Sequence, residues 1–326
     1  MSETILSIEN LRIHFETFAG EVQAIRGVNL KLQKGETLAL VGESGSGKSV
    51  TAKSVMKLLS NNAIVKEGTI IFKGENILEK SERDMQSIRG KEIAMVFQDP
   101  MTSLDPTMKI GKQITEVIIK HEKTSKEEAD KRAEELLELV GIPNAKERMK
   151  QYPHQFSGGQ RQRIVIAIAL ACNPDVLIAD EPTTALDVTI QAQILELMLD
   201  LRQKMDTAVI LITHDMGVVA ETADNILVLY AGKVVEYGSV KEIFNTPKHP
   251  YTKGLLSSIP PLEEDVEELN TIEGTVPGPG QMPVGCRFSP RCPYADERCV
   301  KEQPGIYEAG GAKVSCFRYE GDNYEK

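Results

Sequence analysis

The sequence has no excess of basic residues and no long apolar run, and each absence excludes a class of protein. The 326 residues include 38 Lys and Arg against 48 Asp and Glu, a formal net charge of −10. Such a charge repels a polyanion unless a local basic face outweighs it, and no such face is visible, so we expect no nucleic acid partner. The longest apolar run, Ile164–Cys172, is about half of the roughly 20 residues that a membrane span requires. Membrane association would therefore go through another protein.

Cysteine is scarce, and no secretory signal is visible. The opening "MSETILSIEN" lacks the basic and apolar regions of a signal, and its alternating apolar residues indicate a strand. We therefore expect the chain to stay in the cytosol, where reducing conditions disfavour structural disulfides. Four of the five cysteines gather near the end of the chain. In that compartment they are expected to be metal ligands or redox groups.

Strands alternate with amphipathic helices up to about residue 245, which predicts an α/β fold. Three apolar runs, "ETLALVG", "DVLIADE" and "TAVILITHD", end in polar or glycine-rich loops, as buried and mostly parallel strands do. Residues 125–141 have apolar side chains at helical spacing before Gly141, so we expect a helical insertion there. Its apolar positions are Ala129, Ala133, Leu136, Leu137 and Val140.

Residues 42–49, "GESGSGKS", follow the phosphate-loop pattern between a predicted strand and a predicted helix. The glycines let successive backbone N–H groups point at an anion at a helix N-terminus. Lys48 would bring charge to the β- and γ-phosphates of ATP, and the Ser49 hydroxyl would bind Mg²⁺. The expected nucleotide-binding residues here are Gly42, Glu43, Ser44, Gly45, Ser46, Gly47, Lys48, Ser49 and Val50.

A phosphate loop alone is shared by kinases, GTPases and motor ATPases. Two adjacent acids narrow the class of enzyme further. Asp180 ends an apolar run and is suited to hold Mg²⁺ through its water shell. Glu181 follows it directly and is placed to orient or deprotonate an attacking water. This pair indicates hydrolysis.

The N-terminus of a second predicted helix is suited to bind phosphate. "FSGGQRQR", residues 156–163, offers Ser157 as an N-cap and exposes helix N–H groups at Gly158 and Gly159 before Gln160. One ATP cannot use two distant helix ends of the same chain. A head-to-tail dimer, with the phosphate loop of one subunit facing the serine-glycine helix of the other, resolves this difficulty.

With these motifs, the first three quarters of the chain resemble the ATP-binding subunits of ABC transporters. The resemblance implies a P-loop ATPase domain of that type, with a helical subdomain and an antiparallel β portion. It implies that Phe15 stacks on adenine, a role favoured over that of a core aromatic in a strand because Phe18 lies nearby. The catalytic set that it implies is Lys48, Gln98, Glu181 and His214.

The same resemblance assigns further contacts. Gln98, in "MVFQDP", would touch Mg²⁺ and the water while sensing the transmembrane subunit, and His214 would contact the γ-phosphate. Asp187 belongs to the "ALD" loop that follows the acid pair. The Mg²⁺ contacts expected are thus Ser49, Gln98 and Asp180.

Other stretches resemble one branch of the family. "FQDPMTSLDP" and "PKHPYTKGLLSSIP", with His-Pro-Tyr at residues 249–251, are similar to the dipeptide and oligopeptide importers, whose ATPases carry such a C-terminal extension. The implied function is to energise import of di- or oligopeptides across the cytoplasmic membrane. The expected division is residues 1–245 for the ATP-binding domain, its helical part at about 100–170, and residues 246–326 for a small irregular extension.

The resemblance also implies partners and a location. They are two transmembrane permease subunits, a paralogous ATPase or a second copy of this chain, and indirectly an external substrate-binding protein. The chain would lie peripherally on the cytoplasmic face of the membrane.

Other functions stay open at this point. A nickel or other small-solute importer shares the architecture, and the external protein and the pore would choose the cargo. A soluble ABC ATPase of DNA repair, translation or iron-sulfur assembly is a second alternative. The DNA-repair type would need a long coiled coil, for which the roughly 110 residues from Ser49 to Ser157 leave no room, and the translation type usually carries two cassettes in one chain. A metal-binding or redox module with an ATPase attached is a third reading.

The C-terminal cysteines have the spacing C-x5-C-x6-C-x16-C. Structural zinc sites usually use shorter C-x2-4-C pairs, whereas a 4Fe-4S cluster accepts four thiolates from an irregular loop. The importer resemblance favours 4Fe-4S, with Zn²⁺ as the alternative. The expected ligands are Cys286, Cys292, Cys299 and Cys316, while Cys172 reads as a buried small hydrophobe.

Overall fold

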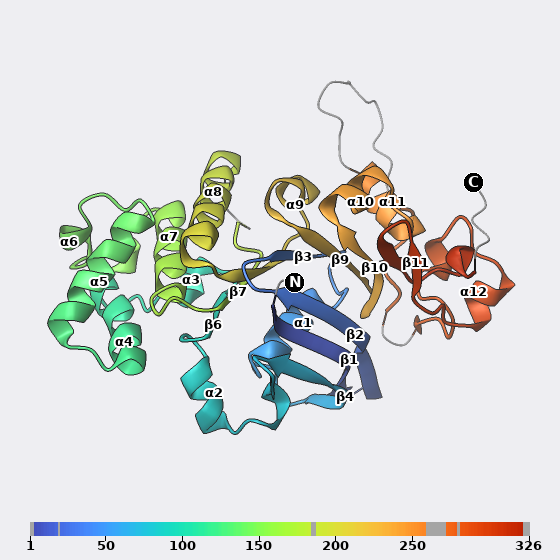
Figure 1. Ribbon diagram of the computed structural model, residues 1–326, viewed down its shortest axis with the longest axis horizontal. Helices are drawn as coiled ribbons and strands as arrows, with labels where there is room; N and C mark the ends of the chain where they lie inside the picture. The colour runs from blue at the N-terminus through green and yellow to red at the C-terminus, as the bar shows by residue number, and fades with distance from the viewer. Residues whose placement is uncertain (1–2, 19, 184–186, 259–271, 279–280, 322–326) are drawn as a thin grey trace. The chain divides into compact units, whose positions relative to one another are not determined.

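The chain forms two compact units in the computed structural model, which describes residues 3–18, 20–183, 187–258, 272–278 and 281–321 (Figure 1). The first unit comprises residues 1–5, 32–37 and 73–212, and the second comprises residues 6–31, 38–72 and 213–326. The acidic run at 259–269 lies outside the described residues. Across the described ranges, no helix has both the length and the apolar character needed to span a bilayer.

The first unit contains three parallel strands that are buried throughout. β7 (Val176–Asp180) pairs on one side with β6 (Ile93–Val96) and on the other with β8 (Ala208–Ile212). Continuous apolar runs predict such strands, because both faces of a parallel sheet are covered. The carboxyl end of β7 presents the acid pair, as the sequence predicts. The unit also contains β5 (Glu75–Asn76), η1 (Ile77–Glu79), α2 (Glu82–Ile88), α3 (Pro100–Ser103), η2 (Pro153–Gln155) and α8 (Val188–Met205).

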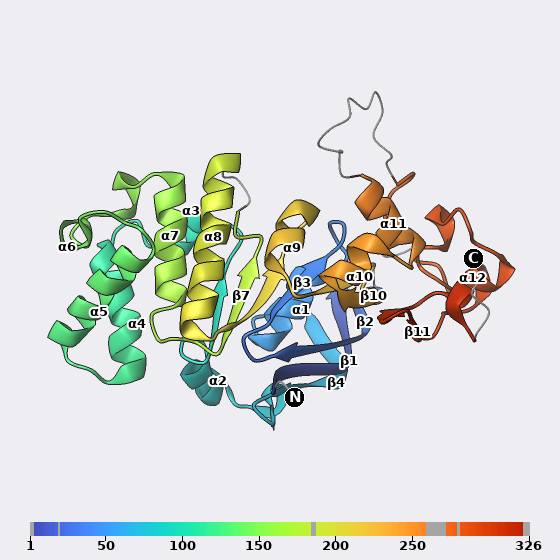
Figure 2. The same cartoon turned by 45° about the horizontal axis from the view of Figure 1, so that its top comes forward.

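The predicted helical insertion is confirmed. α5 (Lys126–Leu139) begins at a capping box of Ser125 and Glu128, and the chain leaves it through Gly141 at φ +76°. The five apolar positions predicted from the spacing are all fully buried. Figures 1 and 2 show α5 beside its partners, which are α4 (Ile110–Glu122), α6 (Ala145–Arg148) and α7 (Gly158–Ala169).

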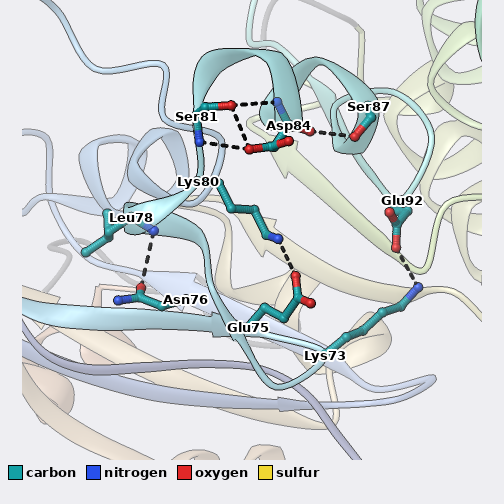
Figure 3. Close-up of polar contacts among 9 residues, drawn as sticks. All are labelled: Lys73, Glu75, Asn76, Leu78, Lys80, Ser81, Asp84, Ser87 and Glu92. Carbon is teal, nitrogen blue, oxygen red and sulfur yellow. Dashed lines mark hydrogen bonds and ion pairs between the residues drawn. The ribbon is translucent and has the colours of Figure 1, made fainter.

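Polar contacts fix the chain before β6 (Figure 3). The Ser81 hydroxyl accepts from the Asp84 N–H and the Asp84 carboxylate accepts from the Ser81 N–H, each at 3.2 Å, so a capping box starts α2. Lys73 Nζ donates to Glu92 at 2.9 Å and to Asp175 at 2.6 Å. Because Glu92 and Asp175 directly precede β6 and β7, one lysine joins the entrances of two paired strands.

An antiparallel sheet opens the second unit, as the family resemblance implies. β1 (Thr4–Thr17) lies between β2 (Gly20–Gln33) and β4 (Ala63–Phe72), and its pairing with β4 is antiparallel. Phe15 lies opposite Ala63 near one end of this pairing.

The C-terminal extension adds strands to another sheet of the second unit. β3 (Thr37–Val41) is parallel to β9 (Asn225–Tyr230), and β9, β10 (Lys233–Ser239), β12 (Ala312–Val314) and β11 (Tyr307–Ala309) follow in antiparallel order. The extension is thus less irregular than predicted, because β12 satisfies the hydrogen bonds of β10. Also in this unit are α1 (Lys48–Val55), α9 (Met216–Thr222), α10 (Val240–Asn245), α11 (Pro250–Ser257), η4 (Ser289–Arg291), α12 (Glu297–Lys301) and η5 (Phe317–Tyr319).

Candidate functional site

The phosphate loop of the second unit joins the buried β3 to α1. Gly42 has φ +145°, and a Cβ there would lie 2.1 Å from the carbonyl oxygen of Leu229. Gly47 caps α1 at φ +102°, where a Cβ would lie 2.7 Å from Ile25 Cδ1. Both positions therefore require glycine for backbone shape and for close packing. The strand, loop and helix occur where the motif requires them.

Lys48 lies over the loop. Its side chain is buried, and its Nζ donates to the carbonyl oxygens of Gly42 at 2.6 Å and of Glu43 at 3.1 Å. These two carbonyl oxygens satisfy hydrogen bonds of the buried amino group. The loop therefore offers an anion a fixed cation beside the N-terminus of α1.

The acid pair ends β7 in the first unit. Asp180 is buried, while Glu181 takes φ +49°, a left-handed conformation that costs free energy for a non-glycine residue. The Glu181 N–H donates to the carbonyl of Ile212 at 2.9 Å, which fixes the turn. Gln98, which follows β6, donates through Nε2 to the Glu181 carboxylate at 2.8 Å. The structure thus brings together two predicted site residues that are 83 positions apart.

The serine-glycine helix start, α7, belongs to the same unit. The Ser157 hydroxyl accepts from the Gln160 N–H at 3.3 Å and the Gln160 side chain accepts from the Ser157 N–H at 3.2 Å, which confirms the predicted N-cap. A Cβ at Gly159 would lie 2.6 Å from Ile190 Cγ2, so this glycine allows α7 to approach α8 closely. Gly158 is the first residue of α7.

Gln162 is a residue of this region that the sequence reasoning missed. Its side chain is buried, and its Nε2 donates to the carbonyl oxygen of Pro182 at 2.6 Å. One turn of α7 is thereby tied to the chain just after the acid pair. A polar residue at the edge of the apolar run "IVIAIALAC" was the signal available, since such a residue is buried only with a partner.

The remaining predicted nucleotide contacts are spread over both units. Asp187 caps α8 by accepting from the Ile190 N–H at 3.0 Å, whereas Ala185 and Leu186 of the same motif lie outside the described residues. His214 is exposed between β8 and α9, and Phe15 is half-buried in β1. Their predicted contacts with ATP stay predictions.

The four C-terminal cysteines line one cavity of about 190 Å³ in the second unit. They form no disulfide, and the Cys286 N–H donates to the Cys299 carbonyl at 2.7 Å. Burial raises the pKa of the Cys299 thiol to about 11. Among the described residues, no three His, Cys, Asp or Glu side chains are grouped closely enough to hold a single metal ion. The predicted ligands therefore surround a space without meeting at one point.

Cys172 behaves as predicted, since it is a buried residue outside that cavity. Its Sγ lies 3.9 Å from the Val117 carbonyl oxygen, and burial raises the pKa of its thiol to about 11. It is a small apolar filler of the first unit.

Two residues of the extension hold the phosphate loop, and neither was assigned to it from the sequence. The Tyr251 hydroxyl accepts from the Glu43 N–H at 2.8 Å. The Arg291 guanidinium donates to both carboxylate oxygens of Glu43, at 2.6 and 3.0 Å. Tyr251 is the last residue of the His-Pro-Tyr motif, and Arg291 directly precedes Cys292.

A phosphate loop, an acid pair after a buried strand and a serine-capped glycine helix are the parts of a P-loop nucleotide hydrolase. Comparison with known proteins identifies the family. The sequence matches the ABC transporter family over residues 25–184 and the oligopeptide/dipeptide transporter C-terminal region over residues 235–299.

Individual relatives agree with these matches. The chain is 60% identical over 306 residues to the oligopeptide transport ATP-binding protein OppD of Bacillus subtilis, covering 93% of this chain and 86% of that protein. It is 56% identical to the dipeptide transport ATP-binding protein DppD of the same organism, covering 97% and 95%. A dimeric post-hydrolysis structure of the ATP-binding cassette MJ0796 with ADP and Pi covers 72% of this chain and 98% of that one, at 29% identity and a TM-score of 0.65.

The chain therefore belongs to the ATP-binding subunits of ABC transporters, as the motifs predicted. It is an ATP-hydrolysing transporter subunit with the cassette fold.

Proposed function

We propose that this subunit energises the import of di- or oligopeptides across the cytoplasmic membrane. The observation that carries the proposal is the match of residues 235–299 to the oligopeptide/dipeptide transporter C-terminal region, which follows the match of residues 25–184 to the ABC transporter family. The relatives at 60% and 56% identity are named for oligopeptide and dipeptide transport, which favours peptides over the nickel alternative.

Transport in vesicles tests this proposal. The subunit would be reconstituted with the permeases and the binding protein of its own system, and ATP hydrolysis would be measured with di- and oligopeptides, with Ni²⁺ and with no solute. We expect peptides to stimulate hydrolysis and to accumulate in the vesicles. Stimulation by Ni²⁺ alone would contradict the proposal.

In the proposed reaction, the phosphate loop binds the triphosphate, and the acid pair binds Mg²⁺ and activates the attacking water. Lys48 and the N-terminal N–H groups of α1 stabilise charge on the β- and γ-phosphates. Ser49, Asp180 and Gln98 would hold Mg²⁺, which would neutralise phosphate charge when bound. Glu181 accepts the proton of the attacking water while Gln98 orients its carboxylate through the 2.8 Å hydrogen bond.

Residues elsewhere complete the site. Ser157, Gly158, Gly159 and Gln160 present the N-terminus of α7 to the ATP of a partner subunit in a head-to-tail dimer, beside Asp187. His214 contacts the γ-phosphate and Phe15 stacks on adenine. The dimeric state of the MJ0796 cassette supports this arrangement.

The partners and the location follow from the importer assignment. The ATPase dimer, built with a paralogue or a second copy, acts on two permease subunits from the cytoplasmic face, and an external binding protein supplies the peptide. The working division is residues 1–245 for ATP hydrolysis and residues 246–326 for the extension.

The four-cysteine cavity is the proposed place of a 4Fe-4S cluster. A tetrahedral zinc site needs four sulfurs at about 2.3 Å from one point, whereas a cluster fills a volume and takes one thiolate at each iron. Four free thiols around about 190 Å³ fit the larger group better. The thiols have to lose their protons when they bind iron, and burial raises the pKa of all four. Loading of the cluster should therefore weaken as pH falls.

Anaerobic purification with metal analysis and a visible absorption spectrum tests the cluster. We expect about four irons per chain and a broad iron-sulfur band. One zinc per chain without that band would replace the cluster by the alternative.

A further inference from the structure

We propose that Arg291 and Tyr251 are positioning residues for the phosphate loop, so that the affinity for ATP depends on the C-terminal extension. The proposal concerns ATP binding by the subunit itself and does not depend on which solute is transported. All the contacts on which it rests lie within the second unit.

Glu43, the second residue of the phosphate loop, is held at its backbone and at its side chain. Its N–H donates to the Tyr251 hydroxyl at 2.8 Å, and its carboxylate accepts hydrogen bonds from both terminal nitrogens of Arg291. Paired hydrogen bonds between a guanidinium and a carboxylate fix direction as well as distance. The Arg291 side chain is 4% exposed and that of Glu43 is 29% exposed, so water screens this pair less than it screens a fully exposed pair.

Contacts other than the pair with Glu43 also hold the Arg291 side chain in place. Its Nε donates to the carbonyl of Glu273 at 2.9 Å and its Nη2 to the carbonyl of Ile272 at 3.2 Å. Its guanidinium also lies 5.8 Å from the centre of the Tyr230 ring. The side chain therefore loses little further freedom when it holds Glu43.

Tyr251 is equally constrained. It is fully buried, and its N–H donates to His249 Nδ1 at 3.0 Å. The N–H groups of Lys248 and His249 donate to the Glu236 carboxylate of β10 at 2.7 and 2.8 Å. The His-Pro-Tyr motif thus forms the capped start of α11, which is bound to a sheet strand, and this helix start places the Tyr251 hydroxyl at the loop.

Two consequences for ATP follow from this arrangement. Lys48 donates to the carbonyls of Gly42 and Glu43, so a shift of Glu43 moves an acceptor of the lysine that faces the phosphates. Arg291 also neutralises a carboxylate that belongs to the anion-binding loop. Without Arg291, the negative charge of Glu43 would repel the triphosphate.

Nucleotide binding to the purified full-length subunit tests the proposal, with a fluorescent ATP analogue and with unlabelled ATP as competitor. We expect Arg291→Gln to raise the Kd for ATP about tenfold, which is about 1.4 kcal/mol. Removing the repelling carboxylate as well, in Arg291→Gln with Glu43→Gln, should restore the part of this loss that comes from repulsion, while the part that comes from lost positioning remains. A residue with only a general structural role would give a double variant at least as weak as the single one.

Lys301→Gln is the control. Lys301 lies in the same extension, is exposed and pairs with the Glu297 carboxylate at 3.0 Å, but it has no contact with the phosphate loop among the described residues. Its replacement should leave the Kd unchanged. An unchanged Kd in Arg291→Gln, an equal rise in Lys301→Gln, or no recovery in the double variant would each overturn the proposal.

Tyr251→Phe keeps the test informative if Arg291→Gln folds poorly. The substitution preserves the ring and removes only the acceptor of the Glu43 N–H, so we expect a rise of about threefold in Kd with a circular dichroism spectrum like that of the wild type. Wild-type affinity in Tyr251→Phe would remove the tyrosine from the mechanism and overturn the proposal as stated.

Discussion

Replacing Glu181 by Gln tests the proposed chemistry with little change in shape. The amide has the size of the carboxylate, and its oxygen can still accept the 2.8 Å hydrogen bond from Gln98. The left-handed backbone at φ +49° imposes the same restriction on either side chain. What the variant loses is the ability to take a proton from water at neutral pH.

The expected loss follows from that chemistry. General base catalysis contributes about 10² to 10⁴ in rate, which corresponds to about 2.7 to 5.5 kcal/mol of transition-state stabilisation. ATP binding depends on the phosphate loop and should persist. The variant should therefore accumulate as an ATP-bound dimer, because ATP closes the dimer and hydrolysis opens it.

Two measurements test this prediction. Phosphate release gives the rate, and size-exclusion chromatography with ATP and Mg²⁺ gives the dimer. Glu138→Gln, at an exposed position of α5, is the control and should behave as the wild type. Hydrolysis by Glu181→Gln at the wild-type rate would show that Glu181 is not the base.

Further predictions concern the loop, the core and a helix cap. Gly42→Ala should abolish ATP binding or folding, because its Cβ would lie 2.1 Å from the Leu229 carbonyl; calorimetry and circular dichroism separate these two results. Leu136→Ala should lower the free energy of unfolding by about 2 to 5 kcal/mol in urea titrations, since that side chain is fully buried. Hydrogen bonds from Thr124 and Ser125 lower the pKa of Glu128 to about 2 from 4.5. Its stabilisation is therefore present above pH 4.5 and is lost as pH falls towards 2. The difference in free energy of unfolding between wild type and Glu128→Gln should therefore narrow over that interval in urea titrations.

The parts of the site that could be predicted are those encoded by neighbouring residues. The loop glycines, the acids at the end of β7 and the Ser157 cap each depend on a few consecutive positions, and the structure shows them as expected. Helical spacing likewise identified the buried face of α5.

The missed contacts join residues that are far apart in the sequence. Nothing near Glu43 points to Arg291, which is 248 positions away, and Arg291 in "SPRC" looks like an exposed charge beside a cysteine. The strands β11 and β12 were missed because each has three residues and they lie in a stretch rich in glycine and proline. Their formation depends on the edge of β10, which local propensity does not contain.

The pairing of Glu43 with Arg291 also sets an order of events during synthesis. The ribosome adds about 5 to 20 residues each second, so the 248 positions that separate them take about 12 to 50 s to make. Once His214 has been made, the cassette motifs are all present, while the arginine that holds their phosphate loop has not been made. A nascent or truncated chain of that length thus carries every residue expected to touch ATP but has a loosely held loop, and the nucleotide site matures only after Arg291 has been added.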